Sequence, residues 1–153
     1  MNYWLMKSEE DEYSIDMLKK DKRAPWFGVR NFQARNFMRD DMKIGDKVLF
    51  YHSNANPSAV VGLAKVASDP HTDKTALDKK SKYSDVRSTK EKPIWECVDV
   101  EFVSKLNNVV TLEYIKGDAE LSNMLVAKRG QRLSIQPVEK SHFDRIIELG
   151  TGK

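Results

Sequence analysis

Cysteine is nearly absent from this 153-residue chain, because Cys97 is the only one. A single cysteine excludes an intrachain disulfide, and no cysteine and histidine set has the spacing of a zinc site. No apolar run approaches the roughly 20 residues that a membrane-spanning helix needs. The N-terminus also lacks the basic and then apolar order of a signal peptide. We therefore expect a soluble protein of a reducing compartment, cytoplasmic or, in a eukaryote, nuclear, with no membrane partner and no metal.

Two other signatures are missing. The chain has no internal repeat, which argues against a solenoid, and no glycine-rich phosphate loop, which argues against a Rossmann or P-loop nucleotide site. We therefore expect no cofactor. The length favours a single domain that spans residues 1–153, with one core and no need of a disulfide or metal, and we expect it to be a monomer.

Acidic and basic residues nearly balance, with 26 basic, 23 acidic and a net charge of +3, but they are segregated along the chain. Residues 1–21 carry three lysines against six acids, and residues 22–43 carry six basic residues against two acids. Residues 128–138 carry three basic residues and no acid. The two basic segments form one anion-facing patch if the fold brings them together, or two solvated faces if it does not.

Apolar patterning predicts strands at residues 3–7, 47–53, 59–67, from 94 onward and at 132–138. Apolar and polar residues do not alternate cleanly in the strands predicted at 47–53 and 59–67, which indicates burial on both faces, as in a small barrel. Gly62 allows another backbone segment to approach closely. Short helices are predicted after the N-cap Ser14, at 111–118 and at 138–150, the last ended by Gly150. The fold class is therefore α+β, with a curved mixed sheet.

The segment at residues 69–92 is polar and highly charged. It predicts a long surface excursion whose lysines mainly keep the protein soluble. The acidic run at residues 9–12 consists of consecutive side chains, which cannot all converge on one ion, so we expect a solvated turn there and not a metal site.

The stretch "PWFGVRNFQARNFMRDDM" at residues 25–42 is more basic than a core segment requires. It predicts a helix over 32–41 with Asn31 as N-cap, a core-facing side and a basic stripe of Arg35 and Arg39. Ahead of the cap, Gly28 permits an unusual turn beside Trp26 and Arg30. An aromatic plane, a guanidinium and free backbone N–H groups suit an anionic or planar heteroaromatic ligand.

Two other places carry site signals. Four hydrogen-bonding side chains follow one another at the end of a predicted strand: Tyr51, His52, Ser53 and Asn54. Trp95 falls on the polar face of its strand, so it either covers a second layer or lines a cavity. A pairing of His52 with Cys97 or Ser134 as a nucleophile is possible, but no nucleophile motif surrounds either residue.

Six segments, in order, resemble the EVE domain family: "NYWLMKSE", "WFGVRNFQARNFMRD", "GDKVLFYHSN", "VVGLAKV", "WECVDVEFV" and "RLSIQPV". The resemblance covers nearly the whole chain. Where the family usually has Lys-Ser-Glu-Pro, this chain reads Lys-Ser-Glu-Glu at residues 7–10, which predicts a less rigid first turn.

The resemblance implies a PUA-like pseudo-barrel of about five to six mixed strands with short surrounding helices. It implies a pocket for a nucleobase, often a modified one, held between aromatic side chains such as Trp26 and Trp95. Carried onto this chain, the family's pocket motifs fall on Lys7, Ser8, Trp26, Gly28, Val29, Arg30, Asn31, Tyr51, His52, Ser53, Asn54, Trp95, Arg132 and Ser134. Flanking phosphates are then expected at Arg35, Arg39, Lys128 and Arg129.

The leading hypothesis is a non-enzymatic reader of DNA or RNA that accepts a methylated or hydroxymethylated base. Two alternatives stay open at this point. One is an enzyme that acts on a modified base or nucleotide, with His52 and either Lys7 or Glu9 as acid and base. The other is a sensor that binds a free base or a sulfonate-like anion without any polymer.

Overall fold

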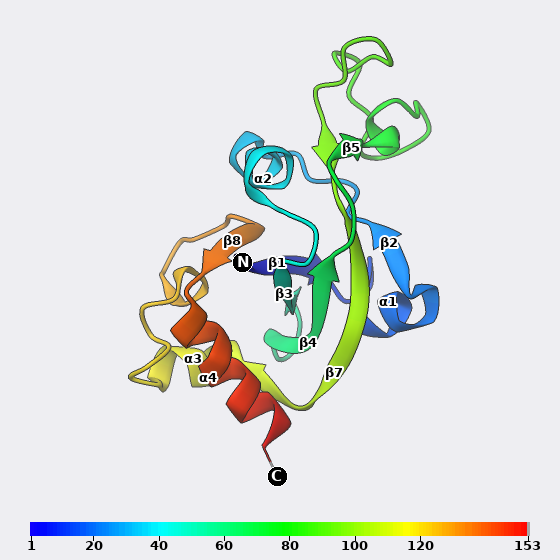
Figure 1. Ribbon diagram of the computed structural model, residues 1–153. Helices are drawn as coiled ribbons and strands as arrows, with labels where there is room; N and C mark the ends of the chain where they lie inside the picture. Colours follow the sequence, from blue (N-terminus) through cyan, green and yellow to red (C-terminus); the bar gives the residue numbers. More distant parts are fainter. Residues whose placement is uncertain (153) are drawn as a thin grey trace.

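The computed structural model describes residues 1–152 and contains one curled six-stranded sheet (Figure 1). The strand order is β2-β7-β4-β3-β1-β8, in which β1 and β3 are parallel and all other neighbours are antiparallel. The strands span β1 Tyr3–Glu9, β2 Arg23–Pro25, β3 Lys47–Ser53, β4 Ala59–Val66, β7 Asp99–Thr111 and β8 Ile135–Val138. A separate pair consists of β5 His71–Thr72 and β6 Glu96–Cys97. The predicted α+β fold with a curved mixed sheet of about five to six strands is therefore confirmed.

Short helices surround the sheet: α1 Ile15–Asp21, α2 Phe32–Asn36, α3 Leu112–Gly117 and α4 Lys140–Thr151. Three-residue 3-10 helices lie at Lys74–Ala76 and Leu125–Ala127. Both predicted N-caps are present, because the Ser14 and Asn31 side chains each accept a hydrogen bond from an N–H three residues further on. The helix predicted over 32–41 is α-helical only to Asn36 and continues as one π-helical turn, Phe37–Asp41.

The sheet separates two apolar clusters, which explains why apolar and polar residues do not alternate along the central strands. Met6 and Phe50 belong to the cluster beneath α1 and α2. Leu5 and Leu49, one position earlier on the same two strands, belong to the cluster beneath α3 and α4. Successive side chains on a strand point to opposite faces, so β1 and β3 each bury side chains on both faces, which was predicted for β3.

Two glycines allow helices to pack closely on the sheet. A Cβ at Gly62 would lie 2.6 Å from Ile15 Cδ1 and 2.9 Å from Ser104 O, so the predicted close approach at this residue is confirmed. Gly150 does not end the last helix, because α4 runs on to Thr151. Its missing side chain admits Leu106, whose Cδ1 would be 2.7 Å from a Cβ there.

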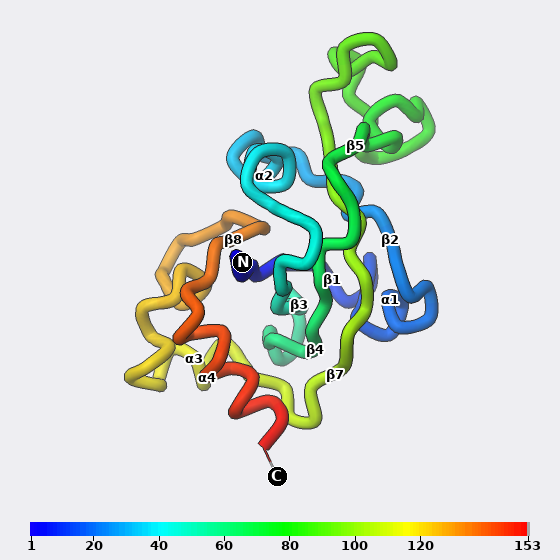
Figure 2. Tube along the Cα trace, in the orientation of Figure 1, coloured from blue at the N-terminus to red at the C-terminus, as the bar shows by residue number. Residues whose placement is uncertain are grey.

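The predicted excursion at residues 69–92 extends away from the barrel (Figure 2). It begins with β5, continues through the 3-10 helix Lys74–Ala76 and returns to the sheet through β6. The strand predicted from residue 94 therefore starts as the short β6, and β7 begins only at Asp99. No helix among residues 1–152 is long and apolar enough to span a membrane.

Candidate functional site

A cavity of about 620 Å³ lies between the end of β1, the segment after β2 and the excursion. Seven of the predicted pocket residues line it: Lys7, Ser8, Trp26, Gly28, Val29, Arg30 and Ser134. Nine other residues complete the wall: Glu9, Glu12, Tyr13, Asp21, Ala24, Pro25, Phe27, Lys82 and Tyr83. Residues far apart in the sequence thus meet at one concave site, whose wall contains aromatic, apolar and charged side chains.

The three tryptophans differ in what their indole N–H groups bind. Trp4 Nε1 donates to Asp46 Oδ2 at 3.0 Å, and Trp95 Nε1 donates to Asp85 Oδ2 at 2.8 Å. Within residues 1–152, no protein atom accepts a hydrogen bond from Trp26 Nε1, and this nitrogen is not fully enclosed. The Trp26 side chain is only 7% exposed and lines the cavity. The Trp26 indole N–H is therefore a donor that stays accessible in the cavity wall.

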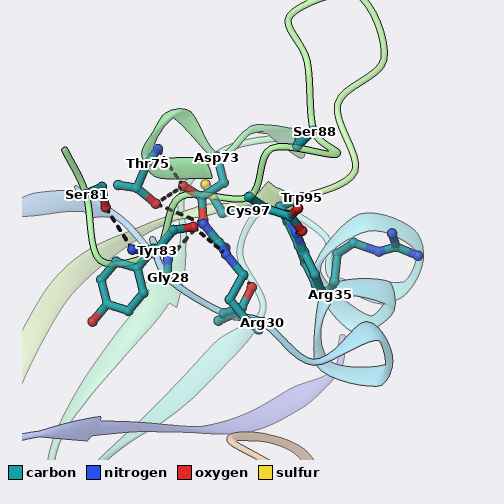
Figure 3. A network of polar contacts seen from close by, with 12 residues as sticks. Gly28, Arg30, Arg35, Asp73, Thr75, Ser81, Tyr83, Ser88, Trp95 and Cys97 are labelled. Atoms are coloured by element: carbon teal, nitrogen blue, oxygen red, sulfur yellow. Dashed lines mark hydrogen bonds and ion pairs between the residues drawn. The ribbon is translucent and has the colours of Figure 1, made fainter. Parts of the chain in front are cut away.

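Tyr83, which lies in the excursion, forms an aromatic wall that the sequence did not predict (Figure 3). Its ring packs on Gly28, where a Cβ would come within 2.8 Å of Tyr83 Cζ. Gly28 has a φ of +87°, so the predicted unusual turn is present and also leaves space for this ring. The Tyr83 backbone is fixed at both ends, since its N–H donates to Ser81 Oγ and its carbonyl accepts from Arg30 Nε.

Arg30 and Asp73 join the excursion to the cavity wall. Asp73 Oδ2 accepts hydrogen bonds from Arg30 Nη1 and Gly28 N, both at 2.9 Å, and Asp73 Oδ1 accepts from Thr75 N (Figure 3). Burial alone would raise the pKa of Asp73, but the bonds from Thr75, Gly28 and Arg30 outweigh it and hold the pKa below its ordinary value. Arg30 therefore fixes the position of Tyr83 and is itself largely committed within the protein.

A lysine and two serines form the end of the cavity near β8. The Lys7 backbone N–H donates to Ser134 O at 2.8 Å, and Lys7 Nζ lies 3.5 Å from Gln131 O. Burial lowers the pKa of the Lys7 amine. Ser8 Oγ donates to Tyr13 O at 2.7 Å, which ties the β1 end to the following turn. This end offers a cation and hydroxyl groups to a ligand.

Carboxylates form another part of the wall. Glu9 Oε1 accepts a hydrogen bond from Asn54 Nδ2 at 2.7 Å, and Glu12 forms an ion pair with Lys82 across from it. With Asp21 they place carboxylate oxygens, which are hydrogen-bond acceptors, in the cavity wall. The acidic run is the predicted turn, as Glu12 N donates to Glu9 O at 3.0 Å, but two of its side chains also line the cavity.

Trp95 does not line the cavity. Its ring is 3% exposed and stacks on Phe32, with centroids 4.8 Å apart and planes 18° from parallel. The guanidinium carbons of Arg30 and Arg35 lie 5.2 Å and 5.8 Å from its centroid. Of the two roles that the sequence left open, Trp95 therefore covers a second layer, between α2 and the excursion, and the expected sandwich with Trp26 does not form.

The strand end at residues 51–54 also lies outside this cavity. His52 lines a separate cavity of about 410 Å³, where its Nε2 accepts a hydrogen bond from Ile15 N at 3.1 Å. Burial lowers the pKa of His52, although the Glu10 carboxylate 3.5 Å from Nδ1 opposes this shift. Because His52 lines a different cavity from Lys7 and Glu9, the structure does not assemble the acid and base pair that an enzyme would need here.

The other predicted residues of the pocket have structural contacts or lie at the surface. Asn31 caps α2 by accepting from Ala34 N at 2.9 Å. Tyr51 is 2% exposed in the cluster beneath α4. Neither Ser53 nor Arg132 lines the cavity.

Cys97 has a histidine neighbour, but it is His71 and not the His52 considered from sequence. Both ring nitrogens of His71 lie 3.9 Å from Cys97 Sγ, and His71 Nε2 lies 2.7 Å from Asp99 Oδ1. Burial and the nearby charges of Asp73 and Asp99 raise the pKa of the thiol. A fully buried, protonated thiol is not a nucleophile, so this group is structural.

The predicted phosphate contacts fall into two groups. Arg35 Nη1 donates to Ile94 O at 2.8 Å, and Arg39 pairs with its neighbour Asp40 at 2.9 Å. Within residues 1–152, Lys128, Arg129 and Arg132 form no ion pair, and Lys128 and Arg129 are exposed. No group of three or more His, Cys, Asp or Glu side chains in the described chain could hold a metal ion.

Comparison with known proteins gives the context of this site. Mouse thymocyte nuclear protein 1 is 38% identical over 97% of this chain and 73% of its own length. A hypothetical protein from Leishmania major is 50% identical, with a TM-score of 0.92 over 98% of this chain and 94% of its own. The human THYN1 protein, solved in complex with DNA that contains 5-methylcytosine, is 35% identical, with a TM-score of 0.90 over 100% and 99% of the two chains.

The fold extends to more distant proteins. The YTH domain of the Zygosaccharomyces rouxii MRB1 protein has a TM-score of 0.58 at 12% identity, a likeness of fold alone. The sequence itself matches the EVE domain family over residues 2–149. This match spans nearly the whole chain and agrees with the six motifs and the curled mixed sheet. The chain therefore belongs to the EVE domain family.

Proposed function

We propose that this protein is a non-enzymatic reader that binds nucleic acid and accepts a methylated or hydroxymethylated base in the cavity of about 620 Å³. The observation that carries the proposal is the accessible indole N–H of Trp26, which has no protein partner among residues 1–152 and faces a cavity that Tyr83 also lines. The human THYN1 complex with 5-methylcytosine DNA supports it, because that protein has the same fold at 35% identity.

Each part of a base has a suitable partner in the cavity. The Tyr83 ring offers a stacking surface, worth on the order of 1 to 3 kcal/mol per base. Trp26 Nε1 and Lys7 Nζ donate to carbonyl or ring-nitrogen acceptors, and the carboxylates accept from an exocyclic amine. A methyl mark contacts the apolar part of the wall, which includes Pro25 and Val29. A base within a duplex must be flipped out of the stack to reach these groups.

Basic side chains outside the cavity contact the flanking phosphates. Lys128 and Arg129 are exposed and keep their charge available, and Arg39 is exposed beside Asp40. Arg35, which is tied to Ile94 O, contributes mainly through its charge. Affinity that depends on such contacts falls steeply as salt rises.

The experiment is a titration of fluorescent oligonucleotides that carry cytosine, 5-methylcytosine, 5-hydroxymethylcytosine or N6-methyladenine at one position, as single strands and as duplexes, in DNA and RNA. Tighter binding of one marked oligonucleotide than of its unmarked match supports the reader. Equal affinity for all of them contradicts it. Binding of free nucleosides without binding of any polymer would instead favour a small-molecule sensor.

A further inference from the structure

A hydrogen-bonded turn in the excursion presents two lysines close to the cavity. Ser81 N donates to Asp78 O, and Lys80 N donates to Asp78 Oδ1, both at 2.9 Å. These bonds close a turn over residues 78–81 that leaves Lys79 and Lys80 exposed at its apex. The next two residues of the chain, 82 and 83, line the cavity.

A second basic turn borders the cavity from another part of the chain. Gln131 N donates to Lys128 O at 3.3 Å, and Gly130 takes a φ of +77° between them. Arg129 is exposed at the apex. The chain then reaches Ser134, which lines the cavity at the Lys7 end.

The cations of both turns are free. Within residues 1–152, Lys79, Lys80, Lys128 and Arg129 form no ion pair. Some basic side chains elsewhere on the surface are paired, for example Lys105 with Asp16 at 2.7 Å. Unpaired cations keep their full attraction for a polyanion.

The acidic turn at residues 9–12 borders the same cavity with the opposite charge. Glu9 and Glu12 line the wall, and Glu10 and Asp11 are exposed beside them. Glu12 is paired with Lys82, but Asp11 forms no ion pair within residues 1–152. This side of the rim repels phosphate groups, so attraction at the two basic turns and repulsion at the acidic turn favour a course that joins the two basic turns.

We propose that the sugar–phosphate backbone of the bound nucleic acid crosses the mouth of the cavity from the turn at 78–81 to the turn at 128–131. The excursion is then part of the nucleic-acid interface, and its lysines do more than keep the protein soluble. The inference rests on the proposed function, because it gives the course of the strand whose base enters the cavity.

The test measures how the dissociation constant depends on salt, using a fluorescein-labelled duplex DNA with one 5-methylcytosine, between about 50 and about 200 mM potassium chloride. The variants are Lys79→Ala with Lys80→Ala, Arg129→Ala, and the control Lys116→Ala. Lys116 is exposed on α3, which covers the other apolar cluster. The logarithm of the dissociation constant rises linearly with the logarithm of the salt concentration, and each lost phosphate contact lowers the slope of this line by about 0.9 for duplex DNA.

We expect the double lysine variant to lose one or two phosphate contacts, which lowers the slope by about 0.9 to 1.8. We expect Arg129→Ala to lose one contact, which lowers the slope by about 0.9. Lys116→Ala leaves it unchanged, and Asp11→Asn raises affinity. An unchanged slope in the variants of either turn, or an equal decrease in Lys116→Ala, overturns the proposed course.

The ratio of affinities for methylated and unmethylated duplexes is measured in parallel. A preserved ratio with unchanged slopes refutes the course alone, whereas the absence of any preference in the unmodified protein refutes the reader function.

Discussion

The ring of Tyr83 lies directly against the backbone of Gly28, so that a Cβ at residue 28 would come within 2.8 Å of Tyr83 Cζ. The two residues come from segments more than 50 positions apart in the sequence, and their contact closes the cavity on the side of the excursion.

Replacing Gly28 by alanine tests this contact. The positive φ alone makes a side chain unfavourable by about 1 to 3 kcal/mol, and the Cβ must also displace the Tyr83 ring. Gly130→Ala is a matched control, because Gly130 has a φ of +77° but a Cβ there would have no atom within 4 Å. We expect Gly28→Ala to lower the free energy of unfolding in urea more than Gly130→Ala does, and to weaken binding of the marked oligonucleotide. Equal losses of stability would show that the contact with Tyr83 contributes nothing.

Asp73→Asn tests the junction between the excursion and the cavity wall. The carboxylate is buried and binds both Arg30 and Gly28, so the variant should lower the free energy of unfolding by about 1 to 3 kcal/mol. The control is Asp40→Asn, whose exposed pair with Arg39 should change stability far less. Urea unfolding measures both variants, and an equally small loss in each would contradict the role of Asp73.

The pH dependence gives a second test of Asp73. Its pKa in the folded state is lowered, so its contribution to stability is present above the unfolded pKa of about 3.9 and is lost as pH falls through the folded pKa. Asp73→Asn should therefore lose less stability than the unmodified protein when the pH is lowered below about 4. The same acid-induced loss in both proteins would contradict the assignment.

His52 should make stability depend on pH near neutrality. Its neutral Nε2 accepts the hydrogen bond from Ile15, and burial lowers its pKa below the ordinary value of about 6.5. The unfolded state then binds more protons, so stability is fully present above about pH 6.5 and falls as the pH drops toward the folded pKa. His52→Gln, which keeps an acceptor but does not titrate, should flatten this part of the curve. A curve of unchanged shape would rule out His52 as its source.

Trp26→Phe and Trp95→Phe make the same chemical change at two sites. Trp26→Phe removes the free indole N–H from the cavity and should weaken binding of the marked oligonucleotide by about fivefold, the equivalent of one hydrogen bond of about 1 kcal/mol. Trp95→Phe removes the bond to Asp85 and should lower stability instead. Fluorescence anisotropy and urea unfolding separate the two effects, and equal loss of affinity in both variants would speak against Trp26 as the contact.

Local patterns in the sequence predicted most of the fold. Hydrophobic runs placed the central strands, and the Ser14 and Asn31 caps placed two helix starts, because these features depend on neighbouring residues. The end of α4 was predicted one residue early, since Gly150 looks like a stop signal until Leu106 of a distant strand packs on it. Contacts of that kind are set by tertiary structure.

The cavity was predicted only in part for the same reason. Trp26 and Gly28 stand in an unusual local context, and both line it. Tyr83 lies within a highly charged segment, where a single tyrosine gives no local signal. Its only trace in the sequence is the requirement at Gly28 for space, which does not say what fills that space. Trp95 was correctly found to be unusual for its strand, but its partners Phe32 and Asp85 come from elements that fold over it.

The most direct test of the account is the ratio of dissociation constants for two duplexes that differ by one methyl group on one cytosine, measured for the unmodified protein and for Tyr83→Ala. We expect the unmodified protein to prefer the methylated duplex by about fourfold, since burying one methyl group is worth about 0.8 kcal/mol. We expect a ratio near one for Tyr83→Ala, because without this stacking surface the base no longer enters the cavity in which Pro25 and Val29 contact the methyl group. Equal affinities in the unmodified protein, or a preference that Tyr83→Ala retains, would contradict it.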